Sequence, residues 1–92
     1  MIDFELYRVF IEVAKEENIT KASEKLNISQ PAVTKQIKNL ENQLSLVLFE
    51  RKSKGLILTE DGKRLYKKLK NPIEELKKID KQIGKEKIIN IG

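Results

Sequence analysis

The sequence predicts a mainly α-helical domain that carries one two-stranded β ribbon and ends in a long helix. Apolar residues recur at helical spacing through residues 4–44 and again through residues 65–83. Between these segments, residues 47–49 and 56–59 are short β-prone runs separated by a basic stretch that contains Gly55. With 92 residues, the chain can build one modest hydrophobic core.

The first predicted helix spans Phe4 to Glu17, and Asp3 is its expected N-cap. Asn18 is the expected stop of this helix, because asparagine tolerates the left-handed conformation that ends many helices. The apolar face of the helix is broader than one neighbouring helix requires. We therefore expect the helix to bury two sides, with another chain as one candidate neighbour.

A short second helix follows, with Thr20 as its expected N-cap and Asn27 as its end. A turn of only one or two residues then leads to a third helix. Either Ser29 or Gln30 is the N-cap of that helix, and the sequence alone does not choose between them. Pro31 suits the first helical turn, where its missing N–H would have no intrahelical partner.

The third helix, residues 30–43, has an apolar stripe on one side and a mostly polar face on the other. The apolar stripe comprises Val33, Ile37, Leu40 and Leu44. The opposite face and its flanks comprise Pro31, Ala32, Thr34, Lys35, Lys38, Asn39 and Asn42. No acidic residue precedes Glu41 on this face, whereas a solvated helix usually pairs Glu with Lys four residues apart. The pattern favours a face that contacts DNA bases and phosphates over a plain polar surface.

The two β-prone runs predict a hairpin whose tip, residues 51–55, carries Arg51, Lys52 and Lys54. A helix, a tight turn, a second helix and a basic hairpin form the plan of a winged helix-turn-helix. In this plan the third helix enters the major groove of DNA, and the wing contacts phosphates or a minor groove. We expect residues 1–58 to form this DNA-binding domain.

A long helix is expected from its N-cap Thr59 through residue 86, with acidic residues in its first turn where the helix dipole favours them. Its apolar residues keep their phase across Pro72, which favours one helix kinked at the proline. A separate helix that begins at Asn71 is the open alternative. The apolar stripe extends beyond the preceding domain, so we expect it to pair with a second copy in a homodimer. This stripe comprises Leu65, Leu69, Ile73, Leu76, Ile79 and Ile83.

Positive charge is concentrated in one segment. Residues 51–70 contain eight Lys or Arg and two Asp or Glu, on a chain whose formal net charge is +5. Such a block is either a solvated helix face or the electrostatic footprint of a polyanion binder.

The composition argues against catalysis. The chain has no cysteine and no histidine, which removes disulfides, thiolate and imidazole chemistry and nearly every zinc site. No pair of carboxylates sits among apolar neighbours that would retune a pKa. We therefore expect no enzyme activity, no metal and no cofactor. No apolar run approaches the ~20 residues that span a bilayer, and the N-terminus lacks the charged-then-apolar layout of a signal peptide, so a cytoplasmic location is expected.

Three other functions fit parts of the sequence. A protein-interaction or dimerisation module with a degenerate helix-turn-helix would have no reason to keep the basic wing with Gln30, Thr34 and Lys38. A binder of double-stranded RNA would be favoured by exposed aromatic residues, and most aromatic residues here lie on apolar stripes. A membrane-surface helix over residues 60–85 would lack the Trp and Phe side chains that anchor such helices.

Residues 19–51, ITKASEKLNISQPAVTKQIKNLENQLSLVLFER, closely resemble the helix-turn-helix signature of LysR-type transcriptional regulators. The Ser-Gln-Pro-Ala, Leu-Glu and Leu-Phe-x-Arg elements stand at the spacing of that family. The segment LILTEDGKRL continues the match with the second wing strand and the Leu-Thr-x-x-Gly start of the linker helix. The resemblance covers residues 3–92.

The resemblance implies a bacterial regulator that dimerises through the linker helix, assembles into tetramers at full length, and binds interrupted palindromes in double-stranded DNA. It also implies a C-terminal domain for a small-molecule effector, which this chain does not contain. By similarity, Thr20 and Lys21 flank the DNA backbone, and the DNA-facing residues are Ser29, Gln30, Pro31, Thr34, Lys35, Lys38 and Arg51. The outward face of the third helix adds Asn39 to the predicted DNA-binding residues, and the basic wing adds Lys52 and Lys54.

Several residues depart from the family pattern. Lys35 replaces a common arginine, which exchanges a bidentate guanine contact for a single-point donor. Ser23 replaces a usual alanine, Ser45 takes a usual glycine position, and Pro72 is unusual in a linker helix. The apolar tail, residues 87–92, is predicted to be the first strand of the effector domain, which suggests that the chain is a fragment.

Overall fold

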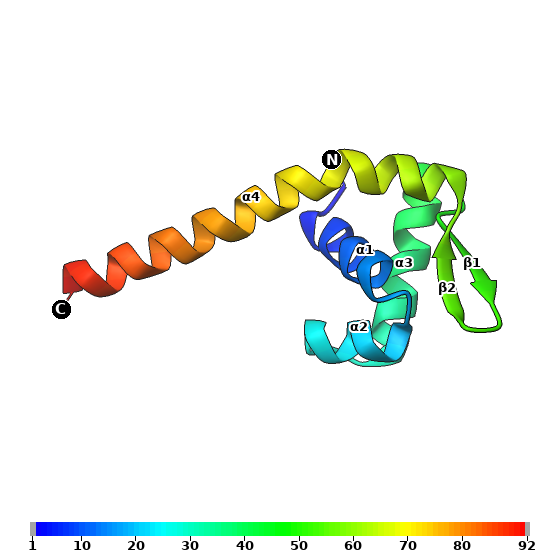
Figure 1. Cartoon of the computed structure of the whole chain (residues 1–92), viewed down its shortest axis with the longest axis horizontal. Helices are drawn as coiled ribbons and strands as arrows, with labels where there is room; N and C mark the ends of the chain where they lie inside the picture. The colour runs from blue at the N-terminus through cyan, green and yellow to red at the C-terminus, as the bar shows by residue number, and fades with distance from the viewer. Residues whose placement is uncertain (1, 92) are drawn as a thin grey trace.

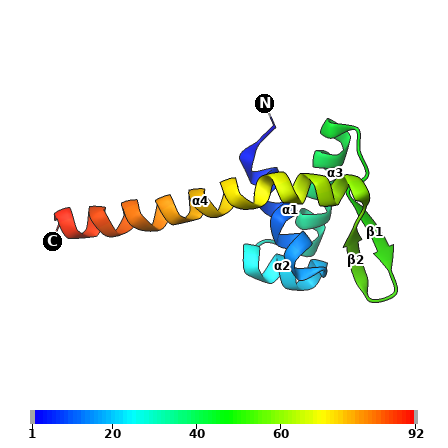
Figure 2. The same ribbon diagram turned by 45° about the horizontal axis from the view of Figure 1, so that its top comes forward.

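The computed structural model describes the backbone of residues 2–91 and the side chains of residues 2–84. Over this part of the chain, four helices and one two-stranded sheet follow one another. Their order is α1 (Phe4–Glu16), α2 (Ile19–Leu26), α3 (Gln30–Leu44), β1 (Phe49–Lys52), β2 (Gly55–Leu58) and α4 (Glu60–Ile91). Helices α1 to α3 form a small bundle, the hairpin extends from one side, and α4 runs along the bundle and projects past it (Figures 1 and 2). The predicted architecture is confirmed.

The connection between α1 and α2 differs from the prediction by one residue. Asp3 caps α1 as expected, because its Oδ1 accepts a hydrogen bond of 2.8 Å from the Glu5 N–H. The helix ends at Glu17, which adopts the left-handed conformation with φ of 52°. Asn18 is therefore not the stop; it caps α2, with its side chain accepting from the Lys21 N–H at 2.9 Å. Asparagine suits both the end of one helix and the N-cap of the next. Because α1 and α2 follow each other so closely, Asn18 serves as the N-cap.

Thr20 is consequently not the N-cap of α2 but lies in its first turn. Asn27 ends α2 in the left-handed conformation, as predicted. Of the two candidates for the cap of α3, the structure selects Ser29, whose Oγ accepts from the Ala32 N–H at 3.2 Å. Pro31 lies in the first turn of α3, as expected.

Helix α3 ends at Ser45, which is left-handed with φ of 56°. Its N–H bonds to the Asn42 carbonyl at 3.3 Å, and the Leu46 N–H bonds to the Glu41 carbonyl at 3.0 Å. A serine thus occupies a conformation that glycine adopts with less strain.

The wing begins later than the sequence suggested. The predicted first strand, residues 47–49, overlaps β1 only at Phe49, and β1 continues through Arg51 to Lys52. Strands β1 and β2 pair antiparallel from Phe49 opposite Leu58 to Lys52 opposite Gly55, so residues 53 and 54 form the turn. The shift follows from Leu48, which is fully buried in the core and anchors the chain before the hairpin starts.

Helix α4 runs through Pro72 as one helix, so the alternative of a new helix at Asn71 is wrong. Pro72 and Lys68, whose carbonyl loses its helical partner, are both exposed, and water can take the place of the missing bond. A kink at Pro72 stays a prediction. The strand predicted over residues 87–92 is wrong for residues 87–91, which continue α4; Gly92 lies outside the described residues.

The core lies where α1 meets the other helices of its own chain. Helix α1 buries Leu6, Val9, Phe10, Ile11 and Val13 and packs against α2, α3 and α4, which explains its broad apolar face. The Phe10 ring also contacts the Phe49 ring of β1 at a centroid distance of 5.4 Å.

Candidate nucleic-acid interface

An open groove lies between the outward face of α3, the wing and the start of α2. Its lining residues come from all three elements. They are Asn18, Ile19, Thr20, Gln30, Pro31, Thr34, Lys35, Lys38, Asn39, Asn42, Arg51, Lys52, Ser53, Gly55 and Leu56. Nine of the twelve residues predicted to face DNA therefore meet in one groove.

The outward face of α3 supplies most of the polar groups in the groove. Because Val33, Ile37 and Leu40 are buried in the core, the opposite side of the helix has to face solvent. Lys35 and Lys38 are exposed. Within the part of the chain with described side chains, neither lysine forms an ion pair, so both charges are available to an anionic partner.

Further along α3, the side chain of Asn39 is held by its neighbour one turn away. The Gln43 Nε2 donates to the Asn39 Oδ1 at 2.9 Å. Asn39 lies on the same helix face as Lys35 and Asn42, and all three residues line the groove.

The wing supplies the opposite wall of the groove. Arg51 forms no ion pair within the described residues. The Lys52 Nζ lies 3.9 Å from the carboxylate of Glu50 on the same strand, and such an exposed pair contributes little to stability. Both cations are therefore able to approach phosphate oxygens.

The wing is fixed to the turn between α1 and α2 by close backbone contact. The Leu56 N–H donates to the Glu17 carbonyl at 3.2 Å. Gly55 has φ of +133°, and a Cβ at this position would stand 2.3 Å from the same carbonyl oxygen. Only glycine permits this approach, so the position of Arg51 and Lys52 relative to α3 depends on it.

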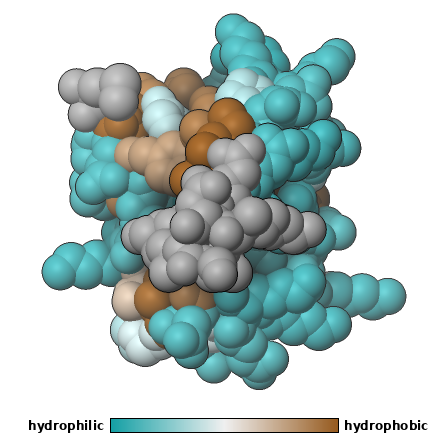
Figure 3. Space-filling model, turned by 90° about the vertical axis from the view of Figure 1, so that its left-hand side faces the viewer, coloured by the Kyte–Doolittle hydropathy of each residue, from teal (hydrophilic) through white to brown (hydrophobic). Residues whose placement is uncertain are grey.

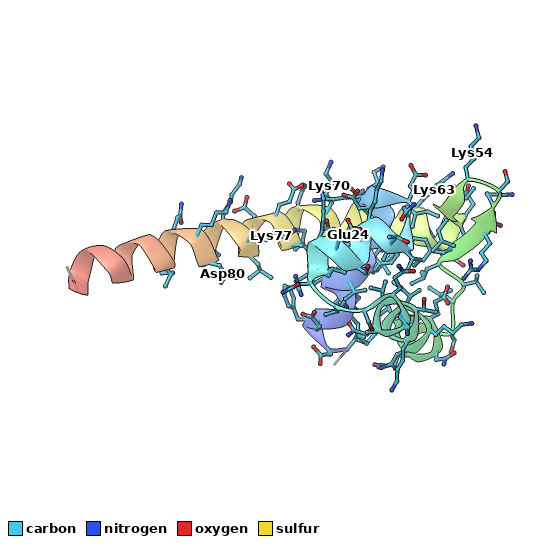
Figure 4. All side chains as sticks on the ribbon, turned by 90° about the horizontal axis from the view of Figure 1, so that it is seen from below. Glu24, Lys54, Lys63, Lys70, Lys77 and Asp80 are labelled. Atoms are coloured by element: carbon cyan, nitrogen blue, oxygen red, sulfur yellow. The ribbon has the colours of Figure 1, made fainter. Side chains whose placement is uncertain are left out.

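Three predicted residues do not line the groove. Ser29 uses its hydroxyl to cap α3, and Lys21 is exposed in the first turn of α2 beside the groove. Lys54 lies at the tip of the hairpin. Figure 4 shows Lys54 pointing to the same side of the molecule as Lys63 and Lys70, away from α3.

The groove also contains residues that the sequence did not single out as contacts. Asn42 lies on the predicted outward face, and helical spacing alone could have found it. Asn18, Ile19, Ser53, Gly55 and Leu56 carry no local signal, because they enter the groove only through the packing of the wing on the turn between α1 and α2.

The apolar stripe of α4 divides into two parts. Ile73 is 2% exposed and belongs to the core, and Leu65 and Leu69 are half-buried against it. The prediction that Ile73 contacts a second copy is therefore wrong, because Ile73 packs in the core of its own chain. Leu76, Ile79 and Ile83 are 43%, 48% and 56% exposed. Figure 3 shows hydrophobic surface in the view along α4 from its C-terminal end.

One ion pair among the described side chains outside the groove joins two helices. The Lys25 Nζ lies 2.8 Å from the Glu16 carboxylate and joins α2 to α1, and this hydrogen bond raises the pKa of Lys25 above its ordinary value.

Among the described residues there is no cluster of three or more acidic, His or Cys side chains that could hold a metal ion. No helix within them is long and apolar enough to cross a membrane.

Residues 4–63 match the model of the bacterial regulatory helix-turn-helix proteins of the lysR family. The chain belongs to this family. Among curated relatives of this LysR-family chain, the HTH-type transcriptional regulator BenM of Acinetobacter baylyi is 38% identical over 89 residues, which is 92% of this chain and 29% of BenM. The LysR-family chain thus spans less than a third of the length of that regulator.

Two solved structures extend the comparison. The BenM DBD–catB site 1 DNA complex is 34% identical with a TM-score of 0.74 and covers 99% of this LysR-family chain and 98% of the solved chain. The full-length virulence activator AphB of Vibrio cholerae is 30% identical with a TM-score of 0.84 and covers 89% of this chain and 28% of AphB.

Proposed function

We propose that this chain is a sequence-specific DNA-binding module of a bacterial transcription regulator, with α3 in the major groove and the wing on the phosphate backbone or in a minor groove. The observation that carries the proposal is the groove itself. It gathers uncharged donors and acceptors from α3 beside cations from both α3 and the wing. A relative of known structure is described as a complex with DNA.

The arrangement suits the division of labour at protein–DNA interfaces. B-DNA has a major groove about 12 Å wide, which admits an α-helix. Gln30 and Thr34 stand at the start of α3, where short polar side chains can reach base edges. Lys38, Arg51 and Lys52 are placed to contact phosphates, which supply affinity and register rather than sequence discrimination.

The exposed end of α4 supports a homodimer. The apolar side chains on this end recur at helical spacing and are exposed to water in the single chain; they are Leu76, Ile79 and Ile83. Pairing α4 with its copy would bury this stripe and present two α3 helices to an interrupted palindrome. In the full-length regulator we expect tetramers and a small-molecule effector domain, a cytoplasmic location, and no enzymatic activity.

Selection of bound sites from random DNA, with the mass of the protein measured in the same buffer, tests the proposal. We expect enrichment of an interrupted palindrome and the mass of a dimer. A dimer that enriches no sequence would instead favour a protein-interaction module. A monomer that enriches a single half-site would leave DNA binding in place and reject the role of α4.

A further inference from the structure

We propose that the contact between α3, the wing and the start of α4 sets the spacing between the two DNA half-sites that the dimer prefers, with Gly62 and Thr59 as positioning residues. The contact is centred on residues 47–49, which we call the junction segment. The inference rests on the proposed function, because a preferred spacing exists only for a dimer on two half-sites. Its test separates the two.

Gly62 brings the backbone of α4 against the junction segment. A Cβ on Gly62 would stand 2.2 Å from the Leu48 carbonyl oxygen and 2.9 Å from the Leu58 Cδ2. The oxygen belongs to the backbone beside a fully buried side chain and has no freedom to yield. Any side chain at position 62 would therefore have to move α4 away from the junction segment.

Thr59 fixes the start of α4 to the same segment through hydrogen bonds. Its Oγ1 donates to the Val47 carbonyl at 2.6 Å and accepts from the Gly62 N–H at 3.0 Å. Its backbone N–H donates to the Leu48 carbonyl at 3.0 Å. One residue thus links two consecutive carbonyl groups of the junction segment to the first turn of α4.

Helix α3 holds the other edge of the junction segment. The Glu41 Oε2 accepts from the Leu48 N–H at 2.7 Å and from the Phe49 N–H at 3.4 Å. Two N–H groups of the segment are therefore bound to α3, and two of its carbonyl groups are bound to Thr59, the residue before α4. The direction of α4 relative to α3 is fixed through a single short piece of backbone, from which the wing also starts.

A second point of attachment lies further along α4, where Ile73 enters the core. The eleven residues from Gly62 to Ile73 correspond to about 16 Å of helix. Past Ile73, α4 leaves the bundle and carries Leu76, Ile79 and Ile83, the exposed stripe of the proposed dimer (Figure 1). The angle between α3 and α4 consequently determines how far apart the two copies of α3 stand.

The expected effect can be sized from these distances. Relief of a 2.2 Å contact to ordinary separation lifts α4 by about 1 Å at Gly62. Over a lever of about 16 Å this is a tilt of about 4°. Across the 24 Å width of the molecule the tilt moves each α3 by about 1.5 Å, or about 3 Å for two copies. The rise of one base pair is about 3.4 Å, and each base pair also turns the duplex by about 35°. A displacement of about 3 Å should therefore misalign the two α3 helices with half-sites at the best wild-type spacing.

The test measures binding of the 92-residue chain to a series of duplexes that carry two selected half-sites with the spacer lengthened or shortened by single base pairs. Gly62→Ala is compared with the wild type and with Val13→Ala, a truncation in the α1 core that lowers stability and removes none of the hydrogen bonds of the junction segment. Thr59→Val removes both hydroxyl bonds without adding bulk and serves as a second variant if Gly62→Ala does not fold.

We expect Gly62→Ala to lose affinity chiefly at the best wild-type spacing, so that its preference for this spacing over its neighbours falls, and Thr59→Val to lose part of the same preference. Val13→Ala should weaken binding at every spacing alike. An unchanged spacing preference in Gly62→Ala, or in Thr59→Val where the alanine variant is unfolded, would overturn the inference while leaving the proposed function intact. Failure of the wild type to bind any duplex would instead reject the proposed function.

Discussion

Replacement of Gly55 by alanine tests how the wing is positioned beside α3. Gly55 has φ of +133°, and an added Cβ would lie 2.3 Å from the Glu17 carbonyl oxygen. Forcing a residue with a side chain into such a conformation costs of order 1–3 kcal/mol. Displacement of the wing would also break the hydrogen bond from Leu56 to Glu17, which is worth about 0.5–1.5 kcal/mol.

Together these terms predict that Gly55→Ala lowers the free energy of unfolding by about 2–4 kcal/mol. In a domain of this size each kcal/mol lowers the melting temperature by about 4–8 °C. The displaced wing would also carry Arg51 and Lys52 away from the DNA. Each lost phosphate contact reduces the slope of log binding constant against log salt by about 0.9, so the slope should fall by about 1–2.

Urea unfolding followed by circular dichroism measures the first effect, and a salt titration of DNA binding by fluorescence anisotropy measures the second. Gly84→Ala is the matched control: among the described residues, no atom outside the neighbouring helix backbone lies within 4 Å of its added Cβ, and in a helix alanine is favoured over glycine by about 1 kcal/mol. Gly84→Ala should therefore keep or raise stability and keep the salt slope. Wild-type stability and slope in Gly55→Ala would refute the positioning of the wing by Glu17.

Three further predictions follow from single positions. Lys52→Ala should reduce the salt slope of DNA binding by about one, whereas Lys54→Ala, which removes the same charge outside the groove, should leave the slope unchanged. Gln30→Ala or Thr34→Ala should relax the discrimination between operator and random DNA in competition assays, with nonspecific affinity largely retained. Ser45→Gly should raise the urea midpoint and the free energy of unfolding, because glycine relieves the left-handed strain at φ of 56°. The gain in free energy should be at most about 1 kcal/mol after the larger chain entropy of glycine is counted.

Each of these expectations has a contrary outcome. Equal slopes for Lys52→Ala and the wild type would mean that the wing lysine contacts no phosphate. Uniform loss of affinity on operator and random DNA would assign Gln30 and Thr34 to backbone positioning. A lower urea midpoint for Ser45→Gly would mean that the serine side chain contributes more than its strained backbone costs.

Much of the interface could be predicted from the sequence because it depends on one regular helix. The stripe of Val33, Ile37 and Leu40 fixes which side of α3 is buried, and the polar face then follows from the helical repeat. The charge of the wing and the cap at Asp3 are equally local, since each depends on residue types within one turn or strand. The choice of Ser29 over Gln30 as the cap of α3 came only from the structure.

The errors concern residues whose role depends on a neighbour in space. Asn18 suits both a helix stop and a helix cap, and only the tight approach of α1 to α2 makes it the cap. The apolar stripe of α4 runs without interruption in the sequence, yet it is divided between the core at Ile73 and the surface at Leu76. No periodicity marks that division, because it depends on where the bundle ends beneath the helix.

The residue pattern along the chain is enough to predict the helices, the hairpin, the outward row of α3 and the positive charge of the wing. How these parts stand relative to one another follows only from contacts in the folded chain. The close approach of Gly55 to the Glu17 carbonyl positions the wing, and the close approach of Gly62 to the Leu48 carbonyl sets the direction of α4. Both are contacts between backbones far apart in the sequence. Glycine has no side chain whose type could indicate a contact in the sequence. The need for glycine at these two positions is therefore visible only in the folded chain.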